Sequence, residues 1–114
     1  MANTFKLVTK ANVTSSDVIY TPDSVTTVIL GLILGNTTTS QVTATVSLAS
    51  STSSRAGDNN EDNQTVELIT NAPIPAGGSL ELLAGNKVVM ENNDALSVSA
   101  SGSTDVALSI MEIS

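Results

Sequence analysis

Short runs of Val, Ile, Leu and Thr recur along this chain, separated by clusters of Asn, Asp, Gly, Pro and Ser. The branched side chains favour extended backbone, and the separating residues favour turns. The clearest run is Gln41 to Ala49, in which apolar and hydroxyl-bearing residues alternate. This period of two predicts a half-buried strand. The residues expected on its buried face are Val42, Ala44, Val46 and Leu48.

The segment from Val25 to Gly35 differs, because apolar residues occupy both faces over its second half. That pattern predicts a central strand covered on both sides, with Gly31 and Gly35 marking a bend, a bulge or a close approach. A neighbouring subunit can supply one of the two covers, so this strand provides a candidate oligomer interface. The candidate interface residues are Val28, Ile29, Leu30, Leu32, Ile33 and Leu34.

The remaining apolar runs are short, and each one ends at a turn signal. Further strands are expected at Phe5 to Thr9, Val18 to Thr21, Thr65 to Thr70, Ser79 to Leu83, Val88 to Glu91, Ala95 to Ser101 and Asp105 to Ile113. Asn71 to Gly78 predicts a rigid extended segment that ends in a turn. Eight or nine short, mostly antiparallel strands favour a β-sandwich or jelly roll over a closed barrel. We predict one all-β domain over residues 1–114, without a helix.

Residues Ser50 to Gln64 contain almost nothing that anchors in a core, so we expect an exposed polar loop. Three of its residues have the spacing of the first ligands of an EF-hand calcium loop: Asp58, Asn60 and Asp62. The pattern then fails, because Asn63 stands where Gly is needed and Ile69 where a bidentate Glu is needed. A solvated loop is the preferred interpretation, and cation binding is left open.

The composition excludes most chemistry. The chain has no His, Cys or Trp, a single Tyr20 and only four Lys or Arg residues, so nucleophiles lack a base and soft metals lack ligands. Glu67, Glu81 and Glu91 allow a glycosidase carboxylate pair to be considered, yet one Phe and one Tyr provide few platforms for a sugar. We therefore predict no catalytic, cofactor or metal site.

The charge and the hydropathy exclude two classes of partner. A net charge of −7 and a pI near 4.1 argue against nucleic acid, which requires clustered cations. The longest apolar stretch, Val28 to Leu34, is too short to cross a bilayer, and the amino terminus shows no secretory signal. The sequons at Asn12, Asn36 and Asn63 are those expected by chance from a composition rich in Ser, Thr and Asn.

The segment Pro73 to Ser114 (PIPAGGSLELLAGNKVVMENNDALSVSASGSTDVALSIMEIS) resembles the carboxy-terminal part of small β-rich virion structural proteins of tailed bacteriophages, particularly marine and cyanobacterial phages. The shared outline runs from an Ile-Pro segment through a Gly turn and an Asp/Asn turn to a terminal Ser-x-x-Glu-Ile. Val25 to Leu32 is similar to the family's first central strand. The resemblance implies a β-rich particle protein present in many copies.

These observations predict a non-enzymatic structural component of a tailed phage particle, located in the virion. A capsid cement or decoration protein is the leading prediction, since a small acidic domain suits an outer, DNA-free position. Its expected partners are further copies of itself, as a trimer or higher oligomer, and the major capsid protein. A neck or tail protein is the alternative within this class. A host-glycan binding module at a fibre tip, using Tyr20 or Phe5, is the alternative from another class.

Overall fold

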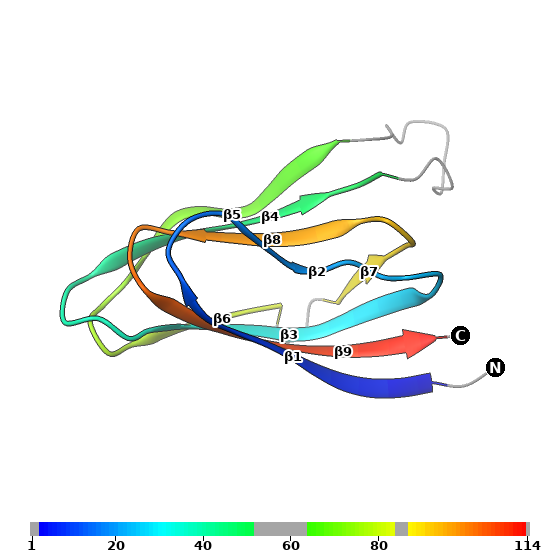
Figure 1. Ribbon diagram of the computed structural model, residues 1–114, viewed down its shortest axis with the longest axis horizontal. Helices are drawn as coiled ribbons and strands as arrows, with labels where there is room; N and C mark the ends of the chain where they lie inside the picture. The colour runs from blue at the N-terminus through cyan, green and yellow to red at the C-terminus, as the bar shows by residue number, and fades with distance from the viewer. Residues whose placement is uncertain (1–2, 52–63, 84–86, 114) are drawn as a thin grey trace.

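The protein consists of two antiparallel β-sheets packed face to face as two layers (Figure 1). The computed structural model describes residues 3–51, 64–83 and 87–113. These ranges contain no helix, and therefore no helix that is long and apolar enough to cross a bilayer. The predicted all-β class is confirmed, with nine strands where eight or nine were expected.

Each layer has four strand positions. Sheet A has the order β1 (Asn3–Val13), β9 (Thr104–Ile113), β3 (Thr26–Asn36) and β6 (Ser79–Leu82), and β7 (Val88–Met90) pairs with the same edge of β3 beyond β6. Sheet B has the order β2 (Asp17–Tyr20), β8 (Ala95–Ala100), β4 (Val42–Ala49) and β5 (Thr65–Ile74).

The strand pairing is nested along the chain. β1 pairs with the last strand, β9, and β2 pairs with β8. β3 pairs with β6 and β7, which together fill one strand position, and β4 pairs with β5. A long hairpin folded over itself in this way forms a jelly roll, so the predicted sandwich of jelly-roll type is confirmed.

The core between the sheets is aliphatic. Val42, Ala44 and Val46 of β4 are buried as their alternation predicts, and Leu48 is half-buried against the core. The largest fully buried side chains come from both sheets: Ile29, Leu32, Leu34, Ile74, Met90, Leu96, Leu108 and Ile110. Phe5 lies outside this core, and Tyr20 is only packed against it. The sandwich therefore folds without a buried aromatic ring in its described core.

A β-bulge interrupts β3. The register with β9 shifts between Ile29 and Gly31, which inserts Leu30 as an extra residue. Before the bulge Thr27 and Ile29 face the core, and after it Leu32 and Leu34 do. Core-facing residues therefore have odd numbers before the bulge and even numbers after it, because one inserted residue exchanges the two faces of a strand. This exchange explains why the sequence of the strand is apolar at both odd and even positions.

Two predicted turns are present. At residues 75–78 the Gly78 N–H donates to the Pro75 carbonyl at 2.9 Å, and Gly77 has φ of 70°, a value that favours glycine. The Asp94 N–H likewise donates to the Glu91 carbonyl. β5 extends past its predicted end at Thr70, because register shifts along the β4–β5 pair accommodate Asn71 and an edge strand tolerates Pro73.

Candidate assembly surface

The outer face of sheet A exposes large apolar side chains. Phe5 is 70% exposed, Leu7 65%, Val89 54% and Ile33 46%, and all four lie on this face. They come from β1, β7 and β3. The outer face of a sandwich is normally polar, and contiguous exposed apolar surface marks an interaction site. We call these four side chains the outer apolar face.

The strand register aligns these residues in rows across the sheet. One row contains Phe5, Met111, Val28 and Val89. The next contains Leu7, Ser109 and Gly31. A third contains Thr9, Ala107, Ile33 and Glu81. The exposed apolar groups therefore occupy adjoining rows of one surface.

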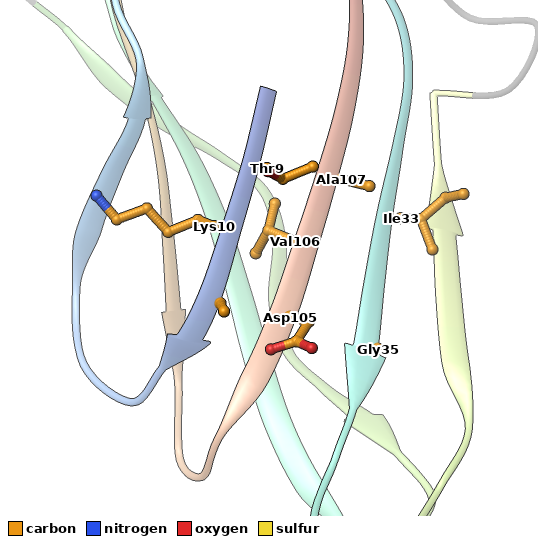
Figure 2. A pocket seen from close by; sticks show the side chains of 8 residues that line it. Thr9, Lys10, Ile33, Gly35, Asp105, Val106 and Ala107 are labelled. Carbon is orange, nitrogen blue, oxygen red and sulfur yellow. The ribbon is translucent and has the colours of Figure 1, made fainter. Parts of the chain in front are cut away.

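A trough runs along the middle of this face. One groove of about 340 Å³ lies between β1 and β3 over β9, and Figure 2 shows Ala107 of β9 between Thr9 and Ile33. A second groove of about 240 Å³ is lined by Leu7, Gly31 and Leu82. Both grooves are lined by Ile33 and Ala107, so they adjoin on this face, and together we call them the trough.

Small residues keep the trough open. The outward residues of β9 at its floor are Ala107 and Ser109, whereas larger side chains stand on the flanking strands. A Cβ added at Gly31 would meet no heavy atom within 4 Å, so no contact inside the chain requires glycine there. The trough therefore has room for side chains from another molecule.

The structure divides the six candidate interface residues between two faces. Three of them are fully or almost fully buried in the core and unavailable to a neighbour: Ile29, Leu32 and Leu34. Val28 and Leu30 are half-buried, and Ile33 is exposed on the outer apolar face. An interface through β3 is thus restricted to Val28, Leu30 and Ile33. That such an interface exists remains a prediction.

The sequence prediction omitted most of the outer apolar face. Phe5 and Leu7 share one side of β1, while Lys6 occupies the other, and this spacing was the available signal. Val89 gave no signal, because it lies in a three-residue strand. The small residues of β9 can be recognised as the floor of a trough only when β1 and β3 are placed beside them.

Tyr20 belongs to a polar network that ties the two sheets together. Its hydroxyl donates to Glu112 Oε2 at 2.7 Å and accepts from Thr27 at 2.8 Å, and Lys6 Nζ lies 2.7 Å from Glu112 Oε1. Burial, more than the neighbouring carboxylate, raises the pKa of Tyr20 to about 12. The hydrogen bonds from Lys6 and Tyr20 lower the pKa of Glu112. A protonated hydroxyl that already donates to Glu112 is not available as a general base.

The three candidate carboxylates do not form a pair. Glu67 lies on β5 in sheet B, whereas Glu81 lies on β6 in sheet A. Glu81 lies opposite Ile33, and Glu91 follows Met90, which lies opposite Thr27. At about 3.3 Å per residue, that offset along β3 separates Glu81 from Glu91 by about 20 Å. Glycosidase carboxylates stand within about 10 Å of each other.

Metal and modification sites gain no support from the described residues. The calcium candidates Asp58, Asn60 and Asp62 lie outside those residues. Across 3–51, 64–83 and 87–113, no three acidic residues gather into a cation site. Asn36 is 3% exposed, and its amide nitrogen donates to the carbonyls of Ser40, Ile74 and Pro75. That sequon asparagine is therefore structural.

The outer face of sheet B contrasts with that of sheet A. Hydroxyl-bearing residues follow its two central strands: Thr43, Thr45 and Ser47 on β4, and Ser97 and Ser99 on β8. Among them, Thr45 Oγ1 accepts a hydrogen bond from the Asn71 N–H at 2.9 Å. The two faces of the sandwich thus differ in chemistry, and sheet A has the apolar one.

Comparisons with known proteins describe only a distant likeness. No protein-family model matches the chain, and no curated protein sequence does. A solved structure of Bacillus endospore appendages, described as a novel family of disulfide-linked pili, shares 11% identity over 96% of this chain and 85% of its own, with a TM-score of 0.43. A structure of infectious bursal disease virus, Gx strain, shares 10% identity over 98% of this chain and 37% of its own, with a TM-score of 0.40. Similarity at this level carries no functional argument.

Proposed function

We propose that this protein is a non-enzymatic structural component of a tailed phage particle, a capsid cement or decoration protein that is present in many copies. The observation that carries the proposal is the outer apolar face of sheet A with its trough. Free in water, this face leaves Phe5 and Leu7 mostly exposed, and a neighbouring subunit removes that surface from water.

The chemistry of the described residues supports a role in assembly. The ionisable network around Tyr20 is a cross-sheet tie, and the three candidate carboxylates lie apart. The likeness of Pro73 to Ser114 to small virion proteins gives the kind of particle in which such a domain works. Weak contacts suffice for a protein of this type, because many copies on one lattice multiply their effect.

A decoration role is preferred over a neck or tail role because of charge. A small domain with a net charge of −7 is repelled by packaged nucleic acid and suits the outer surface of a head. The partner expected at the trough is a second copy of this chain or the major capsid protein.

Quantitative mass spectrometry of purified particles tests the proposal. We expect the chain in amounts comparable to the major capsid protein, as a lattice-wide component requires. A few copies per particle would replace the decoration role by the neck or tail role. Absence of the chain from purified particles would overturn the proposal altogether.

The glycan-binding alternative is less well supported by the geometry. The Tyr20 hydroxyl is engaged by Glu112 and Thr27, so the ring does not present a free polar edge. Phe5 is exposed and remains the available platform. A glycan array probed with the wild-type chain and with Phe5→Ala would support this alternative only if binding occurred and the substitution removed it.

A further inference from the structure

Strand β1 is attached to the fold differently from the other strands. Residues Asn3 to Asn12 are all exposed except Val8, which is half-buried, and only Val13 at the end of the strand is buried. The strand facing it in sheet B, β2, has four residues against the eleven of β1, so much of the inner side of β1 is uncovered. Side-chain burial therefore contributes little to holding β1 in place.

Main-chain pairing with β9 holds β1 instead. Eight consecutive residues, Asn3 to Lys10, align with Ile113 to Val106 without a register shift. The Lys6–Glu112 ion pair adds a side-chain contact along the same strand pair. The β1 strand of a second copy has the same sequence, so it can make the same main-chain pairing with β9 and the same Lys6–Glu112 ion pair.

A hinge lies at the end of this pairing. The register shifts between Lys10 and Val13, and Asn12 has φ of 60°, which is unusual for a residue other than glycine. The next three residues, Thr14 to Ser16, are exposed and connect β1 in sheet A to β2 in sheet B. Short connections that hold strain favour the exchange of an element between copies.

We infer that β1 is exchanged between copies of this chain, so that β1 of one copy pairs with β9 of the next. The occupant of the vacated β9 edge is a second copy, because the register and the Lys6–Glu112 ion pair specify β1 as its complement. Exchange reproduces the contacts of the closed monomer, so it costs little beyond association.

Exchange also joins the copies at the outer apolar face. Phe5 and Leu7 move with β1, so the trough of one copy is completed by side chains of its neighbour. The free edge of β1 itself is a poor site for an added strand, because Lys10 is an exposed charged residue of this edge strand. That copies of this chain meet on a particle rests on the proposed function. The exchange of β1 does not rest on it, because it is argued from the chain alone.

Engineered disulfides test the exchange, because the chain has no native cysteine to interfere. Thr9 and Ala107 are register partners on the outer side of β1 and β9. Antiparallel partners stand about 4.5–5.5 Å apart at Cα, within the range that a disulfide spans. The double variant Thr9→Cys/Ala107→Cys forms a bond within the chain in the closed monomer and between chains after exchange. The control pair is Thr45→Cys/Ser99→Cys, which joins β4 to β8, two strands that remain together.

Non-reducing electrophoresis of oxidised, size-separated fractions gives the readout. We expect interchain disulfide bonds in the oligomer fraction of the β1–β9 variant. The control variant should form only intrachain disulfide bonds. A tagged Thr9→Cys chain refolded together with an untagged Ala107→Cys chain should also yield a mixed dimer. Oligomers that contain only intrachain bonds would overturn the exchange and leave assembly through the outer apolar face intact. Intrachain bonds alone at every concentration, without oligomers, would overturn the exchange and self-association together.

Discussion

Gly31 of β3 lies opposite Ser109 of β9, and a Cβ at Gly31 would extend into the trough without meeting a heavy atom within 4 Å. Glycine inside a strand weakens it by about 0.5–1 kcal/mol relative to alanine. The chain thus retains a destabilising residue where its own packing does not require one. A neighbour seated in the trough, as proposed above, would provide a physical reason.

Gly31→Val is expected to separate folding from assembly. The free energy of unfolding should stay unchanged or rise by up to about 1 kcal/mol, because valine favours a strand and has room. Self-association, measured by sedimentation, should be lost because the side chain fills the trough. Ser109→Ala, which leaves the trough open in the same row, is the matched control. A Gly31→Val protein that assembles like the wild type would refute the assignment of this face.

Leu7→Ser tests the apolar contribution of β1. Leu7 is 65% exposed, so the free energy of unfolding should change by less than about 0.5 kcal/mol. Association should weaken about tenfold or more, as for an anchor residue at an interface. Val18→Ser is the control, since Val18 is also exposed but lies on β2 of sheet B. Equal losses in both variants would indicate nonspecific adhesion.

The tyrosine network predicts a loss of stability in alkali. Because the pKa of Tyr20 is raised from 10.0 to about 12, the folded state holds the phenol proton more tightly than the unfolded state does. The stabilisation is complete below pH 10 and is lost as the pH rises from 10 through about 12. Tyr20 is the single tyrosine, so its ultraviolet titration reads this pKa directly. A midpoint near 10 in the folded protein would contradict the buried hydrogen-bonded geometry.

Glu112 predicts the opposite behaviour in acid. Its pKa lies below the ordinary value of 4.5 in the folded state, so its contribution is present above pH 4.5 and is lost as the pH falls below that value. Lys6→Gln removes the ion pair and should make this acid-side slope shallower. Chemical denaturation of both proteins at pH values below 4.5 provides the comparison, and identical slopes would show that Lys6 does not act on Glu112.

Asn36 should be among the most sensitive polar positions. Its amide donates to three backbone carbonyls, and its oxygen accepts from the Thr38 N–H and hydroxyl, each at 2.8 Å. Asn36→Ala removes these hydrogen bonds, of which the one to the Ile74 carbonyl is buried, and should cost about 2–4 kcal/mol in the free energy of unfolding. Asn36→Asp should also destabilise, because a carboxylate would face the three carbonyls. A loss of less than about 0.5 kcal/mol in urea denaturation would contradict this network.

The sequence predicted individual strands better than it predicted faces. The alternation in Gln41 to Ala49 was sufficient to identify the buried side of β4, because β4 pairs with β8 from Ala44 to Ala49 without a register shift. In β3, Leu30 shifts the parity, so the six apolar residues of Val28 to Leu34 could not be divided between core and surface. A bulge is a property of the strand pair, and β9 lies far away in the sequence.

The candidate surface was less predictable for a similar reason. Alternation places Phe5 and Leu7 on one side of β1, but which side meets the core is set by the pairing with β9, which lies far away in the sequence. The trough needs three strands in register before Ala107 and Ser109 become its floor. Composition alone predicted an inert chain, and only the sheet arrangement identifies where it can make contact.

Imaging of intact particles at side-chain resolution is the decisive measurement. We expect this chain on the particle, with Phe5, Leu7 and Ile33 of the outer apolar face covered by a neighbouring subunit. Gly31 should contact that neighbour, and the hydroxyl-rich face of sheet B should not provide the main contact. A particle in which this chain is present but the outer apolar face is exposed to solvent would contradict the account, as would a particle without the chain.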